Sequence, residues 1–209
     1  MEYIFLIIIL IFSVVIHEVS HGVMANYLGD PTAKNAGRLT LNPIPHIDPI
    51  GSIILPGILL LMNLALSGRG IIFGWAKPVP INPYNFRDQR YGAAKVALAG
   101  PISNLSLALV FGLALRFIPV ISNIPGLYIM FNYIILINLL LTVFNLLPIP
   151  PLDGSHILFS VLPPSLERVK LYLNQFGFFL VILVIFFFFQ WIGLIISWFF
   201  RLIVGVSLM

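Results

Sequence analysis

The sequence predicts an all-α polytopic membrane protein with about four to six transmembrane helices, a re-entrant segment and short extended or β segments in its loops. Of the 209 residues, 60% are hydrophobic and only 9% are charged, whereas soluble domains carry about 25% charged residues. The mean hydropathy is +1.07. So few charges cannot coat a surface in contact with water, and we therefore expect the lipid bilayer to surround most of the chain.

Five apolar stretches are the candidate membrane segments. A helix needs about 20 residues to span the hydrocarbon core of a bilayer, and the first, third and fourth stretches easily reach that length. The last is long enough for one tilted helix that protrudes, or for two short helices broken near Gln190 and Gly193. The stretches are residues 3–28, 52–67, 92–116, 127–148 and 175–206.

The two ends of the chain fit this interpretation. The first stretch lacks the basic leader and the small-residue cleavage site of a signal peptide, so we expect it to be a retained transmembrane helix. We expect residues 1–209 to form a single integral membrane domain, with 175–206 as its C-terminal transmembrane segment.

Two loops, 29–51 and 68–90, are rich in proline, glycine and asparagine. Within them, the segments 38–41 and 77–80 are expected to be extended. Irregular backbone of this kind cannot face lipid, because its amide groups would remain without hydrogen-bond partners. We expect both loops to lie on the membrane surface or to line a cavity walled by protein.

Composition also limits the chemistry of the chain. It contains no cysteine, so any metal must be bound by histidine and carboxylate side chains. The formal net charge is +4. In a membrane protein, we attribute this excess to lysine and arginine in cytoplasmic loops, and we expect no nucleic-acid partner.

The strongest motif is His17-Glu18-Val19-Ser20-His21. Positions i and i+4 share one face of a helix, so both imidazoles can bind one metal ion, with Glu18 beside them to accept a proton from a bound water. Zinc lowers the pKa of such a water to about 7. The motif lies deep in an apolar stretch, where each charge costs about 2.5–3.5 kcal/mol. We therefore interpret it as a metal site rather than as a polar patch between helices.

A zinc site of this kind needs a third protein ligand and leaves the fourth position to water. Asp153 is the best-placed acid, because it follows the fourth apolar stretch after a run of prolines that can unwind the end of the helix. His156, one turn further on, is an alternative ligand, and His46 is another. Asp153 could instead cap a helix that starts at Gly154.

Three motifs now stand in order along the chain: His17-Glu18-x-x-His21, then Ala99-Gly100-Pro101-Ile102-Ser103-Asn104, then Asn145-x-x-Pro148 with Leu152-Asp153-Gly154. In order and spacing, the sequence resembles the site-2 protease family of intramembrane metalloproteases over a catalytic core of about residues 1–160. The longest loops leave no room for a PDZ-like or CBS-like domain. The sequence therefore resembles the minimal branch of that family.

The resemblance implies that His17, His21 and Asp153 bind zinc, one ion per chain, and that Glu18 is the general base. It implies an intramembrane zinc endopeptidase that hydrolyses peptide bonds within or next to transmembrane helices of membrane-anchored substrates, as in regulated intramembrane proteolysis. Asn104 matches a family residue that helps to hold substrate or the developing oxyanion, which suits an amide donor; hydrogen bonding between helices is the alternative. The implied partners are a transmembrane substrate protein and the lipid bilayer.

A shared metal site places a condition on topology. The two histidines lie in the second half of the first stretch, and Asp153 follows the fourth. If the site lies off the midplane, loops 29–51 and 149–174 must share one side of the membrane. If the third and fourth stretches both span, loop 68–90 shares that side too, and 52–67 must dip in and return.

The distribution of positive charge favours this arrangement. With 52–67 re-entrant, only Arg116 and Arg201 lie on the opposite side, which leaves nine of the 11 lysine and arginine residues beside the metal site. With 52–67 spanning, the split becomes seven to four. By the positive-inside rule, we expect the site to face the cytoplasmic side of a prokaryotic plasma membrane.

Two other functions remain open at this point: a metal carrier or channel, and a catalytically silent scaffold that binds transmembrane helices. Glu18→Gln distinguishes them from a protease, because it removes the hydrolytic base but leaves transport or scaffolding nearly unchanged.

Overall fold

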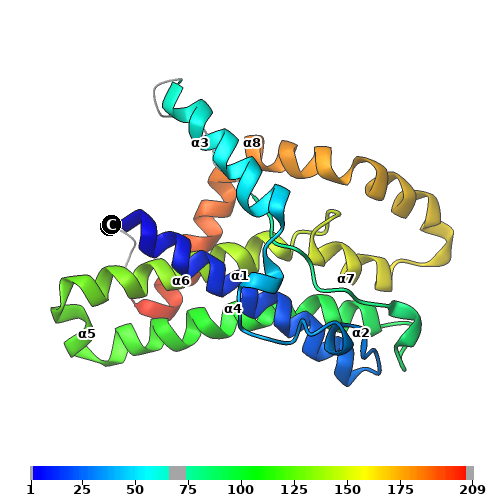
Figure 1. Cartoon of the computed structure of the whole chain (residues 1–209), viewed down its shortest axis with the longest axis horizontal. Coiled ribbons are helices and arrows are strands. Elements are labelled where there is room, and N and C mark those ends of the chain that lie inside the picture. Colours follow the sequence, from blue (N-terminus) through cyan, green and yellow to red (C-terminus); the bar gives the residue numbers. More distant parts are fainter. Residues whose placement is uncertain (1, 66–73, 206–209) are drawn as a thin grey trace.

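The structure is a computed structural model that describes residues 2–65 and 74–205, and it consists of helices joined by irregular loops (Figure 1). Within these residues, four helices are long and apolar enough to cross a bilayer. This confirms the predicted all-α architecture of a polytopic membrane protein. The four are α1 (Glu2–Tyr27), α4 (Gly92–Phe117), α6 (Pro125–Asn145) and α8 (Glu167–Val204).

Shorter elements connect these helices. They are α2 (Thr32–Asn35), η1 (Ile44–His46), the π-helix η2 (Pro49–Ile54), α3 (Leu55–Ala65), η3 (Pro83–Asn85), α5 (Pro119–Asn123), α7 (Asp153–Val161) and η4 (Pro164–Leu166).

The part of the chain that the structure describes contains no β-strand, so the β segments expected in the loops do not form. Segments 38–41 and 77–80 are instead irregular and are held by a few separate hydrogen bonds. The buried Arg38 guanidinium donates to the Lys77 carbonyl at 2.8 Å. The Lys77 N–H donates to the His46 carbonyl at 2.9 Å. These contacts connect the two loops without a ladder of paired strands.

The helices α4 and α6 are joined by α5 and run antiparallel, and α1 packs against both of them (Figure 1). The second half of α8 completes the core, in which Ile135, Leu139 and Phe200 are almost fully buried. The helix α8 continues without interruption through Gln190 and Gly193. It is therefore one continuous helix, about 57 Å along its axis, which is longer than the roughly 30 Å hydrocarbon core.

The helix α3 projects away from this bundle (Figure 1). It accounts for most of the predicted re-entrant stretch 52–67, whose last two residues lie outside the described residues. Together with the adjoining π-helix η2, α3 forms a helical segment of 17 described residues, about 25 Å long, at the short limit for a membrane-spanning helix. The loops before and after it lie at the same end of the bundle, where α1 ends and α4 begins. The two loops contact each other, since the Trp75 N–H donates to the Gly51 carbonyl at 3.1 Å. The re-entrant course of 52–67 stays a prediction.

Asp30 ties these two loops together. Its fully buried carboxylate accepts hydrogen bonds from the backbone and hydroxyl of Thr32, from the Asn82 N–H at 2.7 Å and from the Asn85 amide at 2.8 Å. Burial by itself would raise the pKa of Asp30, but the hydrogen bonds outweigh it and lower the pKa below its ordinary value. The loop before α4 is therefore anchored to the C-terminal end of α1.

Candidate metal centre

The two histidines of the His17–His21 motif lie on one face of α1, which is turned toward α4. Each is only 6% exposed. Their Nε2 atoms lie 3.0 Å apart, and the two rings meet edge to face. The helical spacing of four residues thus brings both ligand atoms to one point, as the sequence predicts.

Asp153, the first residue of α7 and 132 positions after His21, lies at the same point. Its Oδ2 atom lies 3.1 Å from His17 Nε2 and 3.3 Å from His21 Nε2. The proline-rich turn after α6 carries it inward, and α7 packs so tightly against that turn that a Cβ on Gly154 would collide with the carbonyls of Leu146 and Leu147. The helix α7 is capped by Leu152 without a side-chain hydrogen bond, so capping is not the role of Asp153.

The hydrogen bonds at the far side of each imidazole determine its protonation. His21 Nδ1 lies 2.7 Å from the Val96 carbonyl, and His17 Nδ1 lies 2.5 Å from Oδ1 of Asn104. Since both partners accept, each Nδ1 carries the proton and each Nε2 presents a lone pair.

Three electron-pair donors therefore converge on one buried point, an arrangement that requires a cation or a proton between them. Asp153 Oδ2 is buried and has no hydrogen-bond donor. The separations of 3.0, 3.1 and 3.3 Å are close to the roughly 3.3 Å expected between ligands placed 2.0–2.1 Å from a tetrahedral zinc ion. Two imidazoles and one carboxylate are also the ligand set of hydrolytic zinc sites, so the residues fit zinc.

Gly100 on α4 lies directly against this centre. A Cβ there would be 2.5 Å from His21 Nε2 and 2.6 Å from His17 Nε2, so α4 can approach the imidazoles only because this residue has no side chain. Gly100 belongs to the second motif of the sequence, which by itself predicts no function for this glycine. The signal that pointed to it was a glycine beside Pro101 inside an otherwise helical segment.

Glu18, adjacent to the two ligands, has a partner that the sequence did not predict. One of its carboxylate oxygens accepts a hydrogen bond from the Val79 N–H at 2.9 Å. Val79 is buried and packs with Leu39 against Gly22, next to His21. The loop 74–80 thus passes over the metal-binding half of α1 and holds Glu18 from the side.

The two alternative ligands lie elsewhere. His156 is exposed on α7, where it lines a hollow of about 330 Å³ with Asn174 and Phe178 of α8. His46 is buried in its loop, with Nε2 3.0 Å from the Thr40 carbonyl. Among the described residues, the group able to bind a metal consists of His17, His21 and Asp153.

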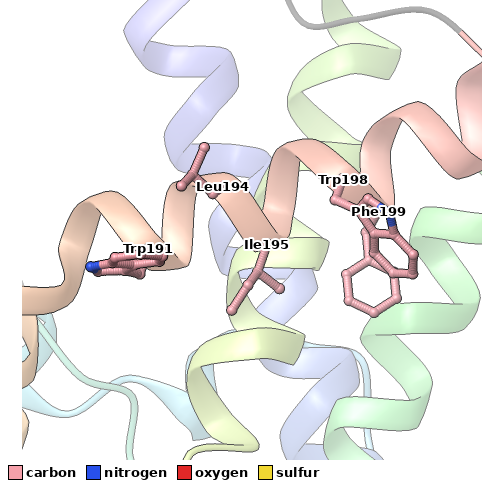
Figure 2. Close-up of a pocket in the computed structure, with 5 residues that line it drawn as sticks. All are labelled: Trp191, Leu194, Ile195, Trp198 and Phe199. Atoms are coloured by element: carbon pink, nitrogen blue, oxygen red, sulfur yellow. The ribbon is translucent and has the colours of Figure 1, made fainter.

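A second hollow, on the surface of α8, lacks the groups needed for catalysis (Figure 2). Its side chains all come from one helix, and none is ionisable. We therefore exclude it as an active site. It is formed by Trp191, Leu194, Ile195, Trp198 and Phe199.

The four apolar helices and the buried cluster define the class of this molecule: a helical membrane protein with a candidate metal centre of two histidines and one carboxylate.

Comparison with known proteins gives the family. The model of Peptidase family M50 matches residues 120–184. The chain is 39% identical over 190 residues to "Putative zinc metalloprotease YwhC" of Bacillus subtilis, covering 87% of this chain and 80% of that protein. It is 33% identical over 174 residues to "Putative zinc metalloprotease Rip2" of Mycolicibacterium smegmatis, covering 83% of this chain and 63% of that protein. No solved structure matches the chain. The chain belongs to Peptidase family M50, the site-2 protease family of membrane-associated zinc proteases.

Proposed function

We propose that this protein is an intramembrane zinc endopeptidase that hydrolyses peptide bonds within or next to transmembrane helices of membrane-anchored substrates, as in regulated intramembrane proteolysis. The observation that carries this proposal is the depth of the candidate metal centre. His17 and His21 lie ten and six residues before the end of the apolar span Phe5–Tyr27, about 15 and 9 Å along the helix axis. The centre therefore lies between the middle of the span and the end at which α1 leaves it. A substrate that reaches this point must itself be embedded in the bilayer.

The candidate residues have distinct roles. His17, His21 and Asp153 would hold one zinc ion per chain. Zinc bound there supplies a Lewis acid that polarises the scissile carbonyl and acidifies a water molecule. Glu18 accepts a proton from the attacking water through the carboxylate oxygen that Val79 leaves free, and delivers it to the amine released when the C–N bond breaks. The Val79 N–H holds the other oxygen and so limits rotation of the base.

Asn104 takes a positioning role in this proposal. It is fully buried, its Oδ1 faces His17, and its amide donates to Asn138 at 2.7 Å and to the Ser13 carbonyl at 3.3 Å. These contacts leave no donor for a substrate carbonyl. They favour orientation of His17 over the contact with substrate or oxyanion that the family resemblance implies.

The proposed location is a prokaryotic plasma membrane with the centre toward the cytoplasmic side. Its support is the excess of lysine and arginine in the loops at the end of the bundle where α1 ends, which is the end that carries the centre.

The test is cleavage in reconstituted liposomes by the wild type and Glu18→Gln. The substrates are a panel of single-span model proteins whose transmembrane helix contains glycine or proline at varied depth. We expect the wild type to cut within or next to the helix, at sites identified by mass spectrometry, and Glu18→Gln to retain zinc but lose cleavage. Cleavage that survives Glu18→Gln, or cleavage confined to soluble domains of the substrates, would contradict the proposal.

A further inference from the structure

A series of hydrogen-bonded, buried polar side chains lies next to the candidate metal centre and connects α1, α4 and α6. Ser13, Asn104 and Asn138 are at most 3% exposed. Polar groups in such a place are costly unless every donor and acceptor is satisfied. Hydrolysis as proposed above uses none of them directly, and only Asn104 touches a metal-binding residue.

The hydrogen bonds of this series have a fixed order of donors and acceptors. The amide nitrogen of Asn138 donates to the Ile134 carbonyl at 2.8 Å and to the Ser13 hydroxyl at 3.0 Å. Its Oδ1 is therefore left to accept from the amide nitrogen of Asn104, at 2.7 Å. The Oδ1 of Asn104 in turn accepts from Nδ1 of His17.

Backbone carbonyls fix this direction, because a carbonyl can only accept. The Ile134 carbonyl requires the nitrogen of Asn138 on its side, which points the oxygen of Asn138 at Asn104. The amide of Asn104 must then turn its own oxygen toward His17. The proton of His17 is thereby placed on Nδ1, and its Nε2 keeps the lone pair that faces Asp153.

We propose that Asn138 is a positioning residue of the metal centre, which acts through Asn104 to set the tautomer of His17. This inference rests on the proposed binding of zinc by His17, His21 and Asp153. Without Asn138, the Asn104 amide keeps only its longer contact with the Ser13 carbonyl, at 3.3 Å, and rotates by 180° more readily. The NH₂ group of Asn104 then faces Nδ1 of His17 and favours the tautomer with its proton on Nε2, which competes with the metal.

The alternative role for Asn138 is hydrogen bonding that only holds α6 against α1 and α4. The protein contains a residue suitable as a matched control for that role. Asn132 lies on the same helix and donates to the Tyr128 carbonyl at 2.7 Å, the same backward contact that Asn138 makes with Ile134. Asn132→Leu removes a comparable amide and leaves the chain of bonds to His17 intact.

The experiment measures zinc affinity of the purified full chain by competition with a chelator, together with the absorption spectrum of the cobalt(II) form. The variants are Asn138→Leu, Asn104→Leu, their double mutant and Asn132→Leu. We expect Asn138→Leu to weaken zinc binding about tenfold, as loss of an outer hydrogen-bond partner does, and to alter the cobalt spectrum. Asn132→Leu should stay within about twofold of the wild type.

If Asn138 acts through Asn104, the losses of zinc affinity caused by the two single substitutions will not add in the double mutant. The double mutant should bind zinc no more weakly than Asn104→Leu alone, because both substitutions break one chain of contacts. Asn138→Asp should retain zinc affinity, since a carboxyl keeps the oxygen that accepts from Asn104. If Asn138→Leu does not fold, Asn138→Ala serves the same comparison without an added branched side chain.

Three results would overturn the inference: zinc affinity of Asn138→Leu equal to that of Asn132→Leu, additive losses in the double mutant, or an equal loss in Asn138→Asp. A fall in thermal stability alone would assign Asn138 to helix packing and would also overturn it. Zinc affinity needs no substrate, so a chain that binds zinc but cleaves nothing would refute the proposed function and leave this inference standing.

Discussion

Gly100→Ala is the most exacting test of the geometry of the metal centre. The added methyl carbon would lie 2.5 Å from His21 Nε2, whereas ordinary contacts begin at 3.4 Å. The helix or the imidazoles must therefore move by about 0.9 Å, the difference of those two distances. Neither can move freely, because the same helix α4 holds both rings at Nδ1, through Val96 and Asn104.

Overpacking of this kind costs about 1–3 kcal/mol, which corresponds to about 5- to 150-fold in an equilibrium constant. We expect Gly100→Ala to weaken zinc binding about 10- to 100-fold. A displacement near 1 Å at a reacting centre costs about 100-fold in rate, so cleavage should fall to about 1% of wild type or less. Zinc affinity is measured by chelator competition, and cleavage with the model substrates described above.

The control is Gly193→Ala in α8, which makes the same substitution in a long apolar helix. A Cβ on Gly193 would meet nothing within 4 Å, so zinc affinity and cleavage should be unchanged. Gly100→Ala protein that binds zinc as tightly as the wild type would show that α4 does not press on the imidazoles, and the geometry derived above would be wrong.

Three further predictions concern the third candidate ligand, the Asp30 carboxylate and the course of residues 52–67. Asp153→Ala should reduce zinc from about one ion per chain to a small fraction, whereas His156→Ala should retain it. Elemental analysis of both purified proteins measures the zinc content. Loss of zinc from His156→Ala but not from Asp153→Ala would identify His156 as the third ligand instead. Asp30→Asn should lower stability near neutral pH by about 1–3 kcal/mol, because it weakens a buried hydrogen-bond hub. The lowered folded pKa means that this stabilisation is present above the unfolded pKa and is lost as pH falls through the folded value. The thermal midpoints of wild type and Asp30→Asn in detergent should thus converge below about pH 4, and a gap that widens in acid would refute the assignment. Single cysteines at Thr40 and Pro80, in a chain that has none of its own, should react with an impermeant reagent from the same side of the membrane; labelling from opposite sides would show that 52–67 spans.

The proximity of the two histidines in the candidate metal centre could be predicted because it depends on helical period alone. A pair of histidines four residues apart in an apolar helix must share a face, whatever surrounds it. Asp153 was harder to select, since the path of a proline-rich turn is set by what it packs against. The tight approach of α7 to the end of α6 at Gly154 selects Asp153 over His156, and no local pattern encodes that approach.

Contacts between distant segments account for what the sequence did not reveal. Gly100, Val79 and Asn138 are ordinary residues for a helix, a loop and a helix, and each gains its importance from a neighbour more than 30 positions away. The unbroken course of α8 has a general cause. In lipid, a helix break exposes backbone amides at high cost, so Gln190 and Gly193 do not end the helix as they could in water.

The hydrogen bond between the Val79 N–H and Glu18 is made by the main chain, and this determines which mutations can detect it. Exchanging the side chain at position 79 alters packing against Gly22 but leaves the donor in place. An alanine scan of the loop would therefore report no loss of this bond at any position. Only proline at 79, or replacement of that amide by an ester, removes the donor. Almost no substitution of a side chain in this loop therefore removes its hydrogen bond with the candidate base Glu18.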